Sequence, residues 1–130
     1  SDDACHILHH VTGIRAPTVA RCQYNFLNPG DHIGYHSDRM KGLPYGVTIV
    51  IAIDDHFSGG RLLIQERTGR TASRTVSTGD IVIFDSALSH CVTRVGKGIR
   101  KTLCIFVSDN DATAVPINFS TNASRAEGTE

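Results

Sequence analysis

The sequence lacks a long apolar run, an excess of charge of either sign and any pair of closely spaced cysteines. No apolar run approaches the roughly 18 residues that span a membrane, and no signal-peptide pattern is present. Basic and acidic residues number 13 each, so the formal net charge is zero. Proteins that bind nucleic acid are usually basic, because they neutralise phosphates, so this balance makes a nucleic-acid partner less expected. The four cysteines form no Cys-x-x-Cys pair, which argues against a disulfide framework or a zinc ribbon.

The composition fits one ordinary globular domain. A chain of 130 residues with 40% hydrophobic residues can bury a core without disulfides. Cys22, Cys91 and Cys104 lie in apolar or alternating runs, where a cysteine is expected to be a small buried hydrophobe. We expect no membrane partner and an intracellular, reducing location, cytoplasmic or nuclear, while the oligomeric state stays open.

The order of local patterns predicts a short helix followed by β-structure. Acidic residues open the segment Ser1–Val11 and Gly13 follows it, as at the two ends of a helix. Short runs rich in Val, Ile, Thr and Phe then alternate with turns that contain Gly, Pro and Asn. The expected strands are Ala20–Leu27, Ile33–His36, Gly46–Ile53, Arg61–Gln65, Ser73–Val76, Asp80–Phe84, His90–Val95 and Lys101–Val107. Their regular spacing predicts a mainly β sandwich or jelly roll over residues 1–119, with a polar mobile tail at 120–130.

A His-x-Asp motif, His36-Ser37-Asp38, is the first candidate for a metal site. Side chains at positions i and i+2 of a strand point to one face, so the imidazole and the carboxylate would converge. They would supply two ligands of the 2-His-1-carboxylate triad that is typical of non-haem Fe(II) oxygenases. His90, at the start of a later strand, is the candidate for the third ligand. A lone histidine in such a position is more often a hydrogen-bonded core residue than a metal ligand.

Arg100 and Thr102 are candidates for a carboxylate-binding pair. Arg100 follows His90 by ten residues and opens the last strong strand, and Thr102 lies on the same face. If Gly96–Gly98 is a hairpin turn, the flanking strands run antiparallel and their side chains share one cavity. An arginine there can bind a carboxylate through two parallel N–H bonds. Taken alone, Arg100 could also be a solvated residue at the start of a strand.

Together these pieces resemble the Fe(II)- and 2-oxoglutarate-dependent oxygenase superfamily, and within it the prolyl-4-hydroxylase-like branch. The matching segments are Tyr24–Asp38 (YNFLNPGDHIGYHSD), Ser58–Ile64 (SGGRLLI), Thr78–Phe84 (TGDIVIF) and His90–Arg100 (HCVTRVGKGIR). The resemblance implies a double-stranded β-helix, or jelly roll, preceded by a short helix. It also implies an enzyme that hydroxylates a C–H bond of a small molecule or of an amino-acid or prolyl side chain, and releases succinate and CO2.

The resemblance also implies roles for individual residues. His36, Asp38 and His90 would be the catalytic metal ligands that hold Fe(II). Arg100 would bind the distal carboxylate of 2-oxoglutarate with support from Thr102. The expected cofactors are Fe(II), 2-oxoglutarate and O2, with ascorbate as an additional candidate.

Further contacts are expected on both sides of this site. Tyr24 would hydrogen-bond the cosubstrate at its distal carboxylate, and Asn25 is the rival for that role, because the register before Asn28-Pro29-Gly30 is open. Tyr35, Arg39 and Tyr45 lie where the substrate of such enzymes usually enters, and we expect them to contact a small-molecule, peptide or protein side-chain substrate.

Two other functions remain in competition. An AlkB-like nucleic-acid demethylase is indicated by the similarity of Val11–Gly13 and Asp31–Asp38 to that family, but the repeated arginines that close the AlkB motif do not follow His90. A non-catalytic, cupin-like metal-binding module would normally show a His-x-His pair and a following Glu, and the sequence has neither in place.

Overall fold

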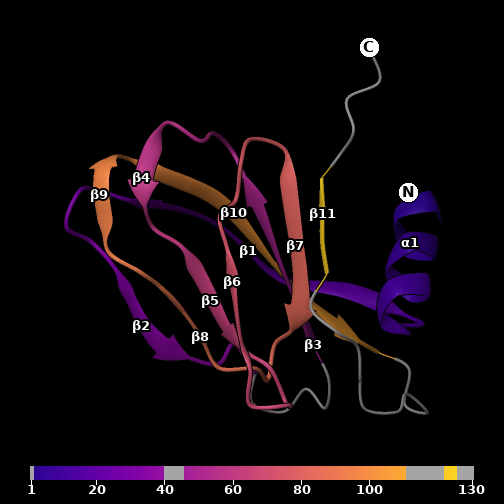
Figure 1. Cartoon of the computed structure of the whole chain (residues 1–130). Coiled ribbons are helices and arrows are strands. Elements are labelled where there is room, and N and C mark those ends of the chain that lie inside the picture. Colours follow the sequence, from indigo (N-terminus) through magenta and orange to yellow (C-terminus); the bar gives the residue numbers. More distant parts are fainter. Residues whose placement is uncertain (1, 40–45, 111–121, 126–130) are drawn as a thin grey trace.

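The structure is a computed structural model, and it describes residues 2–39, 46–110 and 122–125 (Figure 1). These ranges contain one helix and a series of strands. The elements are α1 (Asp2–Thr12), β1 (Pro17–Leu27), β2 (Ile33–His36), β3 (Gly46–Ala52), β4 (Phe57–Gly59), β5 (Leu62–Gln65), β6 (Thr71–Arg74), β7 (Asp80–Asp85), β8 (His90–Val92), β9 (Val95–Gly98), β10 (Arg100–Asp109) and β11 (Asn122–Arg125).

The strands form two facing sheets and a small two-stranded ribbon. The larger sheet has the order β1-β10-β3-β7-β11, the smaller has the order β2-β8-β5-β6, and β4 pairs with β9. Neighbouring strands are antiparallel throughout the described pairings. Figure 1 shows the two sheets as two layers, with α1 on the outer side of the larger sheet. The prediction of a mainly β jelly roll with a short N-terminal helix is therefore confirmed.

The core lies between the two sheets and follows from strand alternation. In β10 the side chains of Thr102, Cys104 and Phe106 are buried on the inner face, and those between them are only partly buried. Phe84 of β7 is fully buried against this layer. β3 is apolar on both faces because it lies between β10 and β7 and is also covered on its outer side, where Ile14 packs. This arrangement explains the nearly continuous apolar run of β3.

The condition set for the strands of His90 and Arg100, a hairpin turn at Gly96–Gly98, is not met. β8 pairs with β2 and β5, whereas β10 pairs with β1 and β3, so the two strands lie in different sheets. The connection is β9, which occupies the segment expected to be a turn and pairs with β4. Neither β4 nor β9 was expected, because three or four residues rich in glycine carry little strand signal. His90 and Arg100 thus lie in different layers and line the same cavity.

Smaller differences concern the ends of the chain and one cysteine. Cys22 is exposed on the outer face of β1 rather than buried, and all four cysteines are free thiols. Within the segment expected to be a mobile tail, β11 pairs with β7. The helix ends where Gly13, with a φ of 79°, donates its N–H to the carbonyl of His9. Among the described residues, no helix is long and apolar enough to cross a membrane.

Candidate active site

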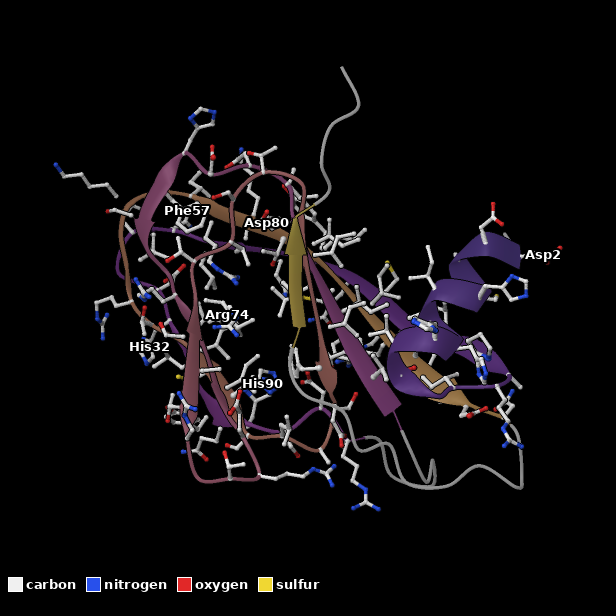
Figure 2. The ribbon with its side chains drawn as sticks, turned by 45° about the vertical axis from the view of Figure 1, so that its right-hand side comes forward. Asp2, His32, Phe57, Arg74, Asp80 and His90 are labelled. Carbon is white, nitrogen blue, oxygen red and sulfur yellow. The ribbon has the colours of Figure 1, made fainter. Side chains whose placement is uncertain are left out.

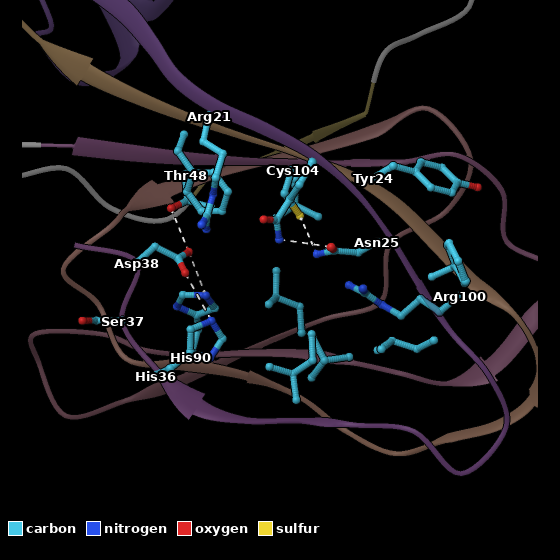
Figure 3. Close-up of a pocket in the computed structure, with 18 of the residues that line it drawn as sticks. Arg21, Tyr24, Asn25, His36, Ser37, Asp38, Thr48, His90, Arg100 and Cys104 are labelled. Atoms are coloured by element: carbon cyan, nitrogen blue, oxygen red, sulfur yellow. Dashed lines mark hydrogen bonds and ion pairs between the residues drawn. The ribbon is translucent and has the colours of Figure 1, made fainter. Parts of the chain in front are cut away.

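Three predicted metal ligands meet at one end of the space between the sheets. His36 ends β2, His90 begins β8, and the two are paired across these neighbouring strands. Asp38 lies between them, with Oδ1 3.2 Å from Nε2 of His36 and Oδ2 3.0 Å from Nε2 of His90 (Figure 3). One ligand atom from each residue lies within 4.8 Å of the others. Figure 2 shows the His90 side chain turned into the interior and His32 turned outward.

Asp38 is held by the opposite sheet rather than by strand alternation. β2 ends at His36, so Asp38 is outside the strand and the expectation of an in-strand pair is wrong in this detail. Its backbone N–H donates to the carbonyl of Ser86 at 2.8 Å. Thr48 of β3 donates its hydroxyl to Oδ2 at 3.0 Å. These two contacts direct the carboxylate towards both imidazoles.

The imidazoles present the nitrogen atoms that a metal needs. Nδ1 of His36 lies 2.9 Å from the carbonyl of Gly34, and Nδ1 of His90 lies 3.0 Å from the carbonyl of Leu88. A carbonyl only accepts, so each Nδ1 carries a proton, and in the neutral rings Nε2 is left as an acceptor. Two acceptors that face a carboxylate repel it unless a cation lies between them. The donor set therefore fits a divalent metal ion.

Burial and hydrogen bonding act in opposite directions on Asp38. Burial by itself raises the pKa of this carboxyl. In the metal-free site, the hydrogen bond and positive charge of a His90 ring protonated on both nitrogens, together with the bond from Thr48, outweigh the effect of burial. The net result is a pKa below the ordinary value of an aspartate. Asp38 is therefore in the charged form that metal binding requires.

A cavity of about 700 Å³ extends from this group between the sheets. Arg100 lies at its other end and is only 3% exposed. Its Nε donates to the carbonyl of Gly60 at 3.0 Å, and its Nη1 lies 3.4 Å from Oγ1 of Thr102. Burial lowers the pKa of Arg100, yet an arginine stays charged at neutral pH. No carboxylate pairs with it within the described ranges, so this buried cation is suited to bind an anion in the cavity.

The structure distinguishes between Asn25 and Tyr24. Asn25 is paired with Thr102 in the register of β1 and β10, and its Nδ2 points to Sγ of Cys104 at 3.5 Å. The Tyr24 side chain belongs to the outer face of β1 and is 50% exposed, beside Phe26. In Figure 3 the Tyr24 hydroxyl points away from Asn25 and Arg100. Both residues contribute to the lining of the cavity, but of the two only Asn25 directs its side-chain polar atoms to Cys104 on the inner face of β10.

The three expected substrate contacts have different positions. Arg39 lines the cavity beside the metal-binding group. Tyr35 is 51% exposed and does not line the cavity; its hydroxyl bonds to Cys91, which raises the pKa of Tyr35. Tyr45 lies outside the described residues.

Two polar residues of the cavity, Thr48 and Arg21, were not predicted from the sequence. For Thr48 there is no signal, because nothing local marks a threonine in an apolar strand as a partner of a distant aspartate. Arg21 also lines the cavity. It could have been found, since it lies on the same face of β1 as Asn25, an even number of residues away.

Fold and site together define a class: a jelly roll with two histidines and one carboxylate at one end of its cavity and a buried arginine at the other. The chain belongs to the 2OG-Fe(II) oxygenase superfamily, because the model of that family matches residues 22–108.

Three similar proteins come from bacteria. A PKHD-type hydroxylase of Klebsiella pneumoniae is 24% identical over 99 residues, which cover 69% of this chain and 44% of the relative. An oxidoreductase of the 2OG-Fe(II) oxygenase family from Burkholderia pseudomallei superposes with a TM-score of 0.65 at 26% identity, covering 71% of this chain and 43% of that one. A Pseudomonas putida prolyl-4-hydroxylase superposes with a TM-score of 0.61 at 22% identity, covering 68% and 51%. The chain therefore spans about half the length of these proteins or less.

Proposed function

We propose that this chain is a dioxygenase that uses Fe(II), O2 and 2-oxoglutarate to hydroxylate a C–H bond of a small molecule or of an amino-acid or prolyl side chain. The observation that carries the proposal is one cavity with two complementary ends. One end holds the ligand atoms of His36, Asp38 and His90, and the other holds the buried guanidinium of Arg100.

His36, Asp38 and His90 would hold the iron. When bound, Fe(II) with 2-oxoglutarate supplies the activation of O2, and one oxygen atom enters the substrate while the other enters succinate as CO2 is released. The two imidazoles act as neutral donors and Asp38 contributes one negative charge. His36 is 40% exposed, whereas Asp38 and His90 are nearly buried, so the accessible side of the centre is the side of His36. We expect ascorbate to sustain turnover by keeping the iron reduced.

Arg100, Thr102 and Asn25 would bind the cosubstrate. A planar guanidinium matches both oxygens of a carboxylate, and the Thr102 hydroxyl stands beside it. The Asn25 oxygen already accepts a hydrogen bond from Gln23 at 3.1 Å, so the Asn25 NH2 group remains as a donor towards the cavity. The distal carboxylate of 2-oxoglutarate would thus meet three sets of donors.

Anaerobic binding tests this assignment. Iron-loaded protein is mixed with 2-oxoglutarate under argon, and the visible metal-to-ligand charge-transfer absorption is recorded. We expect the absorption in the parent chain and in His32→Ala, whose histidine points outward (Figure 2), but not in His36→Ala. In Arg100→Met it should appear only at roughly 10- to 100-fold higher 2-oxoglutarate, because charge-assisted hydrogen bonds are lost.

Three results would contradict the proposal. If the absorption is absent in the parent chain, 2-oxoglutarate is not the cosubstrate of this protein. Metal binding without succinate release for any substrate would favour a non-catalytic, cupin-like module, and succinate release that depends on methylated oligonucleotides would favour an AlkB-like demethylase.

A further inference from the structure

Arg21 lies at the metal end of the cavity and is held there by an aromatic ring. Its Cζ stands 4.5 Å from the ring centroid of Phe106, a nearly buried residue of β10. Phe106 is paired with Thr48 in the register of β10 and β3, and Thr48 hydrogen-bonds to Asp38. Figure 3 shows Arg21 on the side of Thr48 and Asp38, away from Arg100. A guanidinium stacked on an aromatic face keeps its N–H groups free at its edge.

Arg21 and Arg100 are too far apart to bind the same carboxylate of 2-oxoglutarate. Along β1 and β10, Arg21 is paired with Phe106 and Leu27 with Arg100. The two positions are six residues apart on β10, which is about 20 Å along a strand. The five-carbon chain of 2-oxoglutarate is far shorter than this distance. If Arg100 binds its distal carboxylate, Arg21 faces whatever else enters beside the metal.

When Fe(II) and 2-oxoglutarate are bound in the cavity, no negative charge is left over to balance the positive charge of Arg21. Fe(II), the Asp38 carboxylate, the 2-oxoglutarate dianion and Arg100 together carry no net charge. Asp38 is the one acidic side chain among the described residues that line the cavity, whereas Arg21 and Arg39 both line it. Neither arginine is paired with a carboxylate in the part of the chain that the structure describes. The mouth of the cavity therefore presents two positive charges beside the metal centre.

We propose that Arg21, assisted by Arg39, is a specificity-determining subsite that binds a carboxylate of the substrate next to the metal. The inference rests on the proposed function and narrows its substrate class to small carboxylic acids, free amino acids included, rather than internal residues of a protein. The cavity volume of about 700 Å³ is shared with 2-oxoglutarate, which leaves room for one small molecule. The reacting C–H bond would lie close to the carboxylate that Arg21 binds.

The test compares acids with their primary amides, which have nearly the same shape and no charge. Free amino acids and simple carboxylic acids are screened for succinate release, each beside its amide. Binding of the same compounds is measured by calorimetry on the Ni(II)–2-oxoglutarate form, which binds without turnover. We expect acids to bind and react and amides to bind roughly 10- to 100-fold more weakly.

Variants identify the residue responsible. Arg21→Gln should remove the preference for the acid, and Arg21→Lys should restore part of it, because the charge returns without the planar fork. Arg70→Gln is the matched control, since Arg70 is exposed in a turn and does not line the cavity. The affinity for 2-oxoglutarate, taken from the anaerobic charge-transfer titration, should be the same in all three variants as in the parent chain.

The outcomes separate this inference from the proposed function. A missing charge-transfer absorption in the parent chain defeats the proposed function itself. If the absorption forms but Arg21→Gln weakens 2-oxoglutarate binding, Arg21 serves the cosubstrate and the inference is wrong. It is also wrong if amides match acids, if no acid in the panel binds or reacts, or if only nucleotides or oligonucleotides support succinate release.

Discussion

Thr48 donates its one hydroxyl hydrogen to Asp38, and Ser86 in turn donates to Thr48. The two oxygen–oxygen distances are both 3.0 Å. The direction of the second bond follows because a hydroxyl has a single hydrogen, and that of Thr48 is already used. Thr48 and Ser86 are both nearly inaccessible to solvent. A buried chain of hydrogen bonds thus runs from Ser86, directly after β7, through Thr48 of β3 to the candidate metal ligand.

Replacing Thr48 should weaken metal binding without removing a ligand. In Thr48→Val the shape is kept, but Asp38 loses a donor and the Ser86 hydroxyl loses its acceptor. We expect metal affinity to fall about 10- to 100-fold and the free energy of unfolding to fall by about 1–2 kcal/mol. Competition with a chelator and denaturant titration measure the two effects. Thr48→Ser should retain metal affinity, and equal losses in both variants would mean that the methyl group matters rather than the hydroxyl.

We expect replacement of Asn25, but not of Tyr24, to weaken the binding of 2-oxoglutarate. Asn25→Ala should raise the dissociation constant of 2-oxoglutarate about tenfold, because one hydrogen bond to a charged group is lost. Tyr24→Phe removes only a hydroxyl that points away from Asn25 and Arg100, and it should leave the dissociation constant of 2-oxoglutarate unchanged. The anaerobic charge-transfer titration measures both. The reverse result would place the tyrosine in the site and the asparagine outside it.

Replacing Gly60 should affect the backbone conformation and also the position of the Arg100 side chain. Its φ is 57°, and a Cβ built there would stand 2.8 Å from Cδ of Arg100. Gly69 has a φ of 86° but open space around the same position, so it is a matched control. Both alanine variants should lose about 1–2 kcal/mol of stability from the left-handed conformation. Only Gly60→Ala should also weaken 2-oxoglutarate binding, by about tenfold or more, as the guanidinium is displaced.

The four cysteines should react with a thiol reagent at two different rates. Cys5 and Cys22 are exposed, whereas Cys91 and Cys104 are buried. Burial also raises the pKa of Cys104, so less of the reactive thiolate is present at neutral pH. Peptide mapping after short alkylation should find Cys5 and Cys22 modified and Cys104 intact until denaturant is added. Rapid modification of Cys104 in the native protein would show that the cavity opens widely to solvent.

Much of the fold could be predicted from local pattern. Strand alternation and turn residues depend on neighbours along the chain, so the central strand β3 and the long strand β10 were found with nearly correct bounds. The strand expected at Ser73–Val76 lies two residues earlier, as β6, because its ends are set by pairing with β5. The short strands β4 and β9 are stabilised by pairing with each other, and no local sequence pattern indicates them.

The sequence by itself determined which residue types could form the site: His36, Asp38 and His90 for a metal, and Arg100 with Thr102 for a carboxylate. Their order along the chain was enough to indicate the superfamily. Only the tertiary structure decided how they meet. His90 and Arg100 face one cavity from two sheets rather than from one hairpin, and Asp38 is aimed by Thr48 of the opposite layer. The physical reason is that sheet pairing and side-chain hydrogen bonds join residues distant in sequence, which no local periodicity records.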